Sequence, residues 1–265
     1  MSESTELSAA PAERYEAGRS RREAVPLQAH VEAAADAGRV DPLGILAGQD
    51  KTRLPGLIRL RYGRMNRTPF TFLRGAAAVM ASDLAAGART DLQVELYGDA
   101  HLGNFRWYRA PNGDLVFDLN DFDEALPGPF EWDVKRLAAS ITVCARVGGL
   151  AKPQVREATR TALREYRQAI AVASELNPLD LYYYRFNAQA VLERVQKYGT
   201  EHRKWEDAVL AEATRRNSLL AFNKLTKVVR GRRMIVADPP LILRIDDDIA
   251  AAGLGALTQC LEDYR

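Results

Sequence analysis

The segment from Gly98 to Asn104 contains the residue types that phosphoryl transfer requires, in what we predict to be a loop after a short strand. Such transfer needs a carboxylate that orients the nucleophile and accepts its proton, and oxygen ligands that hold Mg²⁺ against the phosphates. Asp99 is predicted as the base and Asn104, five positions later, as a metal ligand. Because Mg²⁺ keeps water and phosphate oxygens as ligands, Asp121 suffices as the second protein ligand.

The elements next to this loop are predicted to bring Asp121 back to it. Residues 92–96 alternate apolar and polar side chains, which favours a short strand. Residues 105–109 and 115–119 are predicted to be two strands, and the Asn-Gly pair between them favours a tight hairpin because both residues tolerate positive φ. The hairpin ends in an acidic cluster, so the sequence places Asp121 beside the loop.

The rest of the chain has mainly helical patterns, so the sequence predicts an α+β fold, mostly helical, with a small β-hairpin that carries the metal site. Asp133 is placed to cap the helix that follows the hairpin. The remaining predicted elements are helices within 27–86 with breaks near Pro42, Pro55 and Pro69, one apolar helical face over 70–84, a helix from near Pro153, a helix from Asn177-Pro178 to Gly199, a helix over about 202–225, and a hairpin around 230–233.

Composition limits the class of protein. The chain has 265 residues, and the polar residues 1–26 are predicted to be a disordered tail ahead of a domain over 27–265. The formal net charge is +2, so no electrostatic argument favours nucleic acid or an anionic membrane as a partner. The sequence has no membrane-spanning apolar run and no signal-peptide core, and its two cysteines, Cys144 and Cys260, are far apart. These features predict a cytoplasmic protein.

Several side chains near the predicted site have two interpretations. Asp118, Asp123 or Glu124 is either an alternative to Asp121 as metal ligand or a solvated acid. Arg74 is a candidate contact of the ATP phosphates, the alternative being a surface ion pair. His101 is a second candidate contact of ATP, the alternative being a brace of the loop.

Three groups of basic or aromatic residues lie outside the predicted site. Lys135 and Arg136 lie in the first turn of a predicted helix, where the dipole disfavours cations, which suggests a partner acid or phosphate. Tyr182–Tyr184 cannot all face one side of a helix, so only part of this run is predicted to be core. The basic residues before and within the last hairpin are predicted to be a solvated turn rather than a nucleic-acid site: Lys224, Lys227, Arg230, Arg232 and Arg233.

The order of these motifs resembles that of aminoglycoside and choline kinases, whose fold is similar to that of protein kinases. The shared order is Gly-Asp-x-His-x-x-Asn, a hairpin, an acidic turn and an Asp that begins a helix. By this resemblance Asp99 is the catalytic base, Asn104 and Asp121 hold Mg²⁺, and the phosphoryl donor is ATP. The resemblance also makes Asp133 the residue that braces the loop, whereas Tyr97 departs from the pattern, since those enzymes usually have His before Gly-Asp.

Four segments also resemble a bacterial family known as a domain of unknown function: residues 70–75, 98–105, 120–124 and 132–137. Members usually extend further and later carry a glycine-rich segment and a strand lysine that look like the nucleotide-clamping half of a kinase. By this resemblance residues 27–265 are a kinase-like domain that is incomplete at its C-terminus. Alone they are expected to bind ATP weakly, because no glycine-rich loop precedes a strand lysine in this sequence.

The sequence therefore predicts a phosphotransferase that depends on Mg²⁺ and ATP. It names neither the acceptor, which is a small molecule or a protein, nor the oligomeric state. One alternative is a kinase-like domain without activity that binds a partner. The other is a metal-dependent phosphoesterase. Such enzymes need further clusters of histidine and acidic metal ligands, whereas this sequence has only three histidines, His30, His101 and His202.

Overall fold

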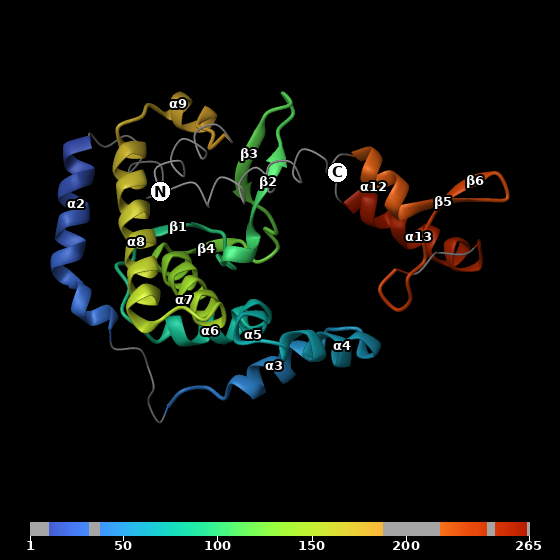
Figure 1. The fold of residues 1–265 in the computed structure, drawn as a ribbon, viewed down its shortest axis with the longest axis horizontal. Coiled ribbons are helices and arrows are strands. Elements are labelled where there is room, and N and C mark those ends of the chain that lie inside the picture. Colours follow the sequence, from blue (N-terminus) through green and yellow to red (C-terminus); the bar gives the residue numbers. More distant parts are fainter. Residues whose placement is uncertain (1–10, 32–37, 188–217, 243–246, 264–265) are drawn as a thin grey trace. The chain divides into compact units, whose positions relative to one another are not determined.

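The computed structural model describes residues 11–31, 38–187, 218–242 and 247–263. The chain divides into two compact units, Met1–Asn187 and Ala188–Arg265. The described part is an α+β structure, mainly helical, with three two-stranded antiparallel sheets (Figure 1). No described helix is both long enough and apolar enough to cross a membrane.

The segment predicted to be a disordered tail contains helix α2, Pro11–Ala24. Its residues are polar, but most are Ala, Glu and Arg, which have high helix propensity. The prediction from composition weighed the lack of apolar residues and not this propensity. A short 3₁₀ helix, η1, follows at Leu27–His30.

Three prolines begin helices in the next segment, because a proline at the first helical position has no N–H to leave unpaired. The helices are α3 (Pro42–Asp50), α4 (Pro55–Met65) and α5 (Pro69–Gly75), followed by α6 (Ala77–Ala85). Leu46 of α3, Met65 of α4, Val79 of α6 and Ala76, between α5 and α6, form a small core.

The prediction of one continuous helical face over 70–84 was wrong, because α5 and α6 are separate helices. The chain leaves the helical conformation at Ala76, where φ is −122° and ψ is 37°. Gly75 lies directly on Met65, so that a Cβ added there would be 2.6 Å from the Met65 Cγ. This close approach to the end of α4 explains the break, which an apolar period alone does not reveal.

The two sheets of the first unit carry the predicted hairpin and one unexpected strand. Strands β2 (Phe105–Arg109) and β3 (Leu115–Leu119) pair as predicted, with Gly113 in the turn at φ 91°. Strand β1 (Gln93–Leu96) also confirms its prediction and pairs with β4 (Leu126–Pro129). The sequence of β4 is Leu-Pro-Gly-Pro, which contains none of the β-branched and aromatic residues that signal a strand.

Two long helices follow in the chain and pack against each other: α7 (Glu131–Val147) and α8 (Lys152–Ser174). A hydrogen bond of 2.9 Å between the hydroxyls of Thr142 and Thr159 joins them. Helix α9, Pro178–Tyr183, begins at the predicted Asn177 cap but ends well before Gly199, which lies outside the described residues. All three tyrosines at its end are exposed, so no part of that run is core.

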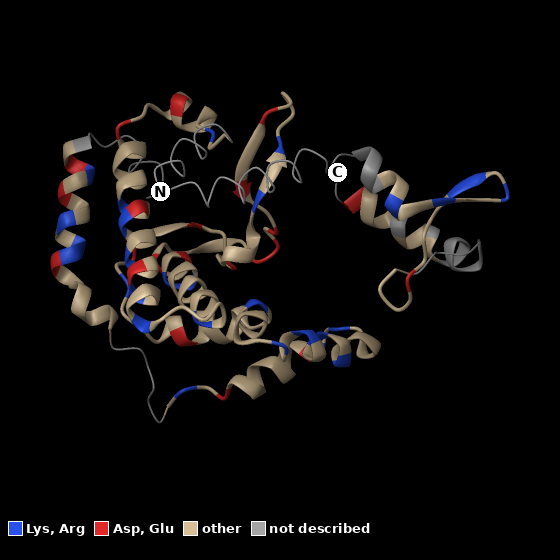
Figure 2. Cartoon of the chain, in the orientation of Figure 1, with Lys and Arg blue, Asp and Glu red and all other residues tan. Residues whose placement is uncertain are grey.

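The second unit contains α12 (Ser218–Leu225), the hairpin of β5 (Thr226–Val229) and β6 (Arg232–Ile235), and α13 (Asp247–Asp263). The hairpin confirms its prediction, and its turn residues Arg230 and Gly231 both have positive φ. Lysine and arginine line this hairpin and are exposed, as expected for a solvated turn (Figure 2). The predicted helix over 202–225 is described only from Ser218 onward.

Candidate functional site

The loop after β1 is held at its start by Asp133. The Asp133 carboxylate accepts hydrogen bonds from the backbone N–H of Tyr97 at 2.7 Å and of Gly98 at 3.0 Å. Asp133 is the third residue of α7, so the prediction that it caps this helix was wrong; Phe130 occupies the cap position without a side-chain bond. The carboxylate that was free to cap the helix instead fixes the first two residues of the loop.

Gly98 is required by the path of the loop. Its φ is 87°, a left-handed conformation that glycine adopts without cost. A Cβ at this position would lie 1.9 Å from the Glu124 carbonyl oxygen, which belongs to the acidic turn. The loop and the acidic turn therefore approach each other with room for a hydrogen atom only.

Gly98→Ala is expected to lower the free energy of unfolding by about 2–3 kcal/mol, from the φ penalty and the backbone clash together. Gly113→Ala is the matched control, because Gly113 has a φ of 91° but nothing within 4 Å of an added Cβ. That control is expected to lose only about 1 kcal/mol. Equal losses for the two variants in urea unfolding would show that the contact with Glu124 is unimportant.

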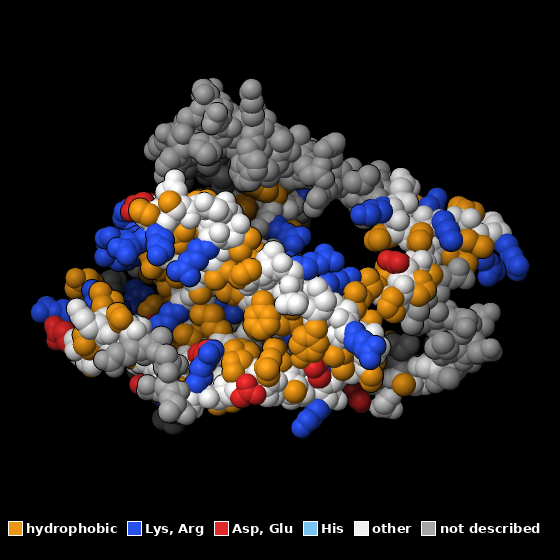
Figure 3. Space-filling model, turned by 60° about the horizontal axis from the view of Figure 1, so that its bottom comes forward, with side chains coloured by type: hydrophobic (Ala, Val, Ile, Leu, Met, Phe, Trp, Pro, Cys, Tyr) orange, Lys and Arg blue, Asp and Glu red, His pale blue; other side chains and the backbone are white. Residues whose placement is uncertain are grey.

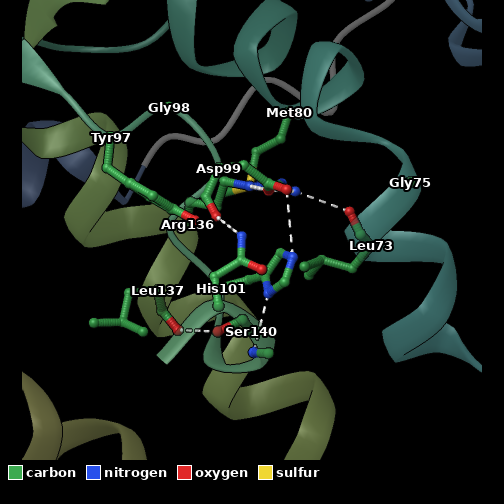
Figure 4. Close-up of polar contacts among 12 residues, drawn as sticks. Leu73, Gly75, Met80, Tyr97, Gly98, Asp99, His101, Arg136, Leu137 and Ser140 are labelled. Carbon is green, nitrogen blue, oxygen red and sulfur yellow. Dashed lines mark hydrogen bonds and ion pairs between the residues drawn. The ribbon is translucent and has the colours of Figure 1, made fainter. Parts of the chain in front are cut away.

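The Asp99 carboxylate is buried and bound by two side chains (Figure 4). The Arg136 guanidinium, from the first turns of α7, donates to Oδ1 through Nε at 2.5 Å and forms the ion pair through a second nitrogen. His101 Nε2 lies 3.3 Å from Oδ2. The sequence predicted a partner acid or phosphate for Arg136 without naming it, and the partner is the predicted base.

Arg136 also connects two further helices to this carboxylate. It donates to the Leu73 carbonyl oxygen in α5 at 3.0 Å, and its other terminal nitrogen is 3.6 Å from the Met80 sulfur in α6. Its side chain is only 3% exposed. A buried arginine needs such partners, because an unpaired buried charge is costly. Arg136 is therefore the side chain that joins α5, α6 and the loop to α7.

His101 braces the loop from within. It is 2% exposed, and its Nδ1 accepts a hydrogen bond of 3.0 Å from the Gly103 N–H. An accepting Nδ1 assigns the ring proton to Nε2, which faces Asp99. Ser140 of α7 also supports the loop. Its Oγ accepts a hydrogen bond of 3.2 Å from the Leu102 N–H and donates one to the Leu137 carbonyl oxygen (Figure 4). This is the bracing role considered for His101; a contact with ATP stays a prediction.

Asn104 joins the loop to the end of the hairpin. Its side chain is buried, and Nδ2 donates to the Asp99 carbonyl oxygen at 3.2 Å. Its own carbonyl accepts from the Asn120 N–H at 3.1 Å, so Asp121, the residue after Asn120, follows directly on a contact with the end of the loop. Asp121 is exposed and has a φ of 72°, an uncommon backbone conformation for a residue other than glycine.

The Tyr97 hydroxyl lies among the acids of the site. It donates to the Asn120 carbonyl oxygen, and its ring packs edge-on against Phe122 with centroids 5.2 Å apart. Burial raises the pKa of Tyr97 to about 12; a hydrogen bond with Asn104 lowers it, and the charges of Asp121, Asp99 and Asp123 raise it further. Three carboxylates from the loop and the acidic turn therefore act on one phenol.

Alkaline titration tests this placement of Tyr97. Its pKa is raised from 10.0 to about 12, so the unfolded chain loses this proton first and stability falls as pH rises through that interval. Each such tyrosine contributes at most about 1.4 kcal/mol per pH unit to the slope. Tyr97→Phe is expected to reduce the slope and to remove a late-titrating phenolate from the absorbance at 295 nm, whereas Tyr15→Phe, at an exposed position, should leave that late phenolate in place.

Metal binding at Asn104 and Asp121 remains a prediction. Within residues 11–31, 38–187, 218–242 and 247–263, no group of three or more His, Cys, Asp or Glu side chains is arranged to hold a metal ion. Asp118, one of the alternative ligands, accepts from the Leu119 N–H at 2.8 Å and is exposed. The same finding gives no support to a phosphoesterase with two metals, which requires such clusters.

Two guanidinium groups lie at the Gly103 turn. Arg74 is exposed on α5, and its Nε would be 3.4 Å from a Cβ placed on Gly103. Arg106 Nε donates to the Gly103 carbonyl oxygen at 3.1 Å. The sequence drew attention to Arg74 but missed Arg106, whose only signal was its position at the start of the hairpin next to the predicted ligand Asn104.

Comparison with known proteins identifies the family but no characterised relative. No curated protein and no solved structure matches the chain. A family model described as an uncharacterized protein conserved in bacteria (DUF2252) matches residues 53–265. This range contains every residue of the candidate site and most of the chain. The chain therefore belongs to the bacterial DUF2252 family.

Proposed function

We propose that this protein is a phosphotransferase that depends on Mg²⁺ and ATP, with Asp99 as the base and Asn104 and Asp121 as the metal ligands. The observation that carries the proposal is the 3.1 Å hydrogen bond from the Asn120 N–H to the Asn104 carbonyl. It joins the end of the hairpin to the loop, which is the arrangement that lets a base and two ligands serve one phosphate. The order of motifs shared with aminoglycoside and choline kinases supports the same assignment.

The contacts of Asp99 leave one acceptor position for a substrate hydroxyl. Each carboxylate oxygen can accept about two hydrogen bonds. Oδ1 receives two nitrogens of Arg136, whereas Oδ2 has only the single contact with His101. A nucleophile at Oδ2 would be oriented by the carboxylate and would give up its proton there as the phosphoryl group leaves ATP. Mg²⁺ at Asn104 and Asp121 would neutralise the charge that develops on the phosphate oxygens.

Arg74 is proposed to bind the phosphates of ATP across the Gly103 turn. Arg74→Ala is then expected to raise KM for ATP by about 10- to 100-fold, the value of a charge-assisted hydrogen bond, with a smaller effect on kcat. Steady-state kinetics with ATP as the varied substrate measure this change. The control is Arg109→Ala, which removes an exposed cation whose partner is the Gly113 carbonyl in the hairpin turn. The assignment of Arg74 fails when both variants keep the wild-type KM.

One observation favours a second candidate, a kinase-like domain that binds a partner without catalysis. The Asp99 side chain is 13% exposed and both of its oxygens have partners, which suits a structural ion pair as well as a base. In that case Asp99 supports the loop, and the exposed acidic turn around Asp121 is the part that meets a partner.

Phosphoryl transfer measured on the complete product of the reading frame separates these candidates. With radiolabelled ATP, the proposal predicts Mg²⁺-dependent transfer to an added acceptor or to water that EDTA abolishes. Mn²⁺ in place of Mg²⁺ should broaden the NMR signal of the Asn104 side-chain amide. Asp121→Asn is expected to remove both effects, and Asp118→Asn, at a nearby exposed acid, neither. Folded protein that neither binds Mn²⁺ at Asn104 nor transfers phosphate favours the partner-binding domain.

A further inference from the structure

Lys135 is a cation whose partner is missing from the described part of the chain. Its neighbour Arg136 pairs with Asp99, but no described carboxylate lies within ion-pair distance of the Lys135 ammonium. Its one hydrogen bond goes to the Ala88 carbonyl at 3.4 Å, which is long. Burial lowers the pKa of Lys135, and the charge of Glu131 only partly opposes this effect. Lys135 therefore carries a positive charge that Glu131, one turn earlier in α7, opposes only from beyond ion-pair distance.

Lys135 lines a cavity of about 490 Å³ between η1, α5, α6 and the start of α7. This volume is within the range of small-molecule sites. The face on which α5 and α6 lie comes forward in Figure 3, where hydrophobic side chains gather among lysines and arginines. The cavity wall is mainly apolar and includes Phe72, Leu73, Val79, Met80 and Leu84.

Some polar groups on the wall of this cavity lack a hydrogen-bond partner or an ion-pair partner among the described residues. His30 Nδ1 is buried and has no hydrogen-bond partner among the residues described. Arg39 and Asp83 at the same wall satisfy each other through two hydrogen bonds of 2.7 Å. Arg136 is also satisfied, because it binds Asp99 and the Leu73 carbonyl. The unmet polar groups are thus an ammonium and an imidazole, which together suit an anion.

We propose that this cavity binds a small amphipathic carboxylate, with its apolar chain against Phe72, Val79 and Met80 and its carboxylate at Lys135. The apolar wall supplies affinity through buried area, and the half-buried ammonium selects for negative charge, since a charged group in a partly dry site gains most from an opposite charge. The inference is independent of the proposed phosphotransferase activity. Arg136 separates the two sites, because the same side chain lines the cavity and holds Asp99.

Calorimetry with octanoate, octan-1-ol and octylamine tests the choice of charge on the whole protein. Octanoate is expected to bind at least about tenfold more tightly than octan-1-ol, and octylamine not to bind. Lys135→Met should remove the preference for octanoate and leave the affinity for octan-1-ol unchanged. Lys152→Met, which removes an exposed lysine of α8, should change neither. Equal binding of octanoate and octan-1-ol by the wild type, or equal effects of the two lysine variants, would overturn the proposal.

Methyl NMR on wild-type protein locates the ligand even if Lys135→Met fails to fold. Met80 lines the cavity, whereas Met234 belongs to strand β6 of the second unit. Octanoate should shift the ¹³C-methyl signal of Met80 in a saturable manner and leave that of Met234 unchanged. A saturable shift of Met234 alone, or no shift of Met80 at saturation, places octanoate elsewhere and refutes the assignment.

Discussion

Arg136→Met is expected to lower the free energy of unfolding of the first unit by about 3–5 kcal/mol, the usual cost of removing one partner of a buried ion pair. The loss is large because the Asp99 carboxylate would be left in a buried position with only His101 beside it. The Leu73 carbonyl would lose its guanidinium donor at the same time. Urea unfolding followed by circular dichroism measures the change.

The control for this prediction is Arg146→Met, an arginine of the same helix that is exposed. It is expected to change stability by less than about 0.5 kcal/mol. A double-mutant cycle that combines Arg136→Met with Asp99→Asn isolates the energy of the pair. If the two single losses simply add, the contact between Arg136 and Asp99 contributes nothing of its own, and the loss in Arg136→Met has another cause.

If the proposed phosphotransferase activity is present, Asp99→Asn is expected to reduce turnover by about 10²–10⁴-fold, the usual effect of losing a positioned base. Affinity for ATP should change little, because the proposed ligands of the nucleotide and metal are other residues. The structure adds a consequence for stability, since the asparagine leaves Arg136 without its anionic partner. Activity must therefore be measured under conditions where unfolding curves show the variant to be folded.

A second variant separates catalysis from folding in this experiment. Arg136→Lys keeps a cation near Asp99 and should restore part of the stability that Arg136→Met loses, although lysine lacks the planar fork of donors. If Asp99→Asn and Arg136→Lys are equally stable but only Asp99→Asn is inactive, the carboxylate acts in the reaction. Equal activity of folded Asp99→Asn and wild type removes Asp99 from the mechanism.

Local sequence signals were sufficient to predict the hairpin of β2 and β3, which leads into the acidic turn of the candidate site. Strands β2 and β3 were predicted from two apolar runs on either side of an Asn-Gly turn, and the structure has the predicted boundaries. Only Gly113 uses the positive φ that was expected of both turn residues, since Asn112 instead accepts from the Asp114 N–H through its side chain. Pairing of β1 with the Pro-containing β4 depends on contacts distant in sequence, and no local pattern indicated it.

The candidate site was predictable in its members but not in its contacts. The sequence grouped Asp99, Asn104 and Asp133. In the structure Asp133 joins α7 to the loop by accepting from the Tyr97 N–H, and the Asn104 side chain donates to the Asp99 carbonyl within the loop. The sequence did not indicate that the Asp99 carboxylate would face Arg136, 37 positions away. That contact arises from the packing of α5 and α6 against α7, which a residue pattern does not specify.

The position of Arg136 has a consequence for the motions that the first unit can make. One side chain of α7 holds the end of α5, the Met80 side chain of α6 and the carboxylate of the loop, while Asp133 in the same helix holds the Tyr97 and Gly98 amides. The loop therefore cannot open by itself, although loops are usually the least stable parts of a protein. Its amides are expected to exchange with solvent only when α5 and the start of α7 separate, because these contacts make four segments one cooperative opening unit and hold Asp99 as firmly as the helices around it.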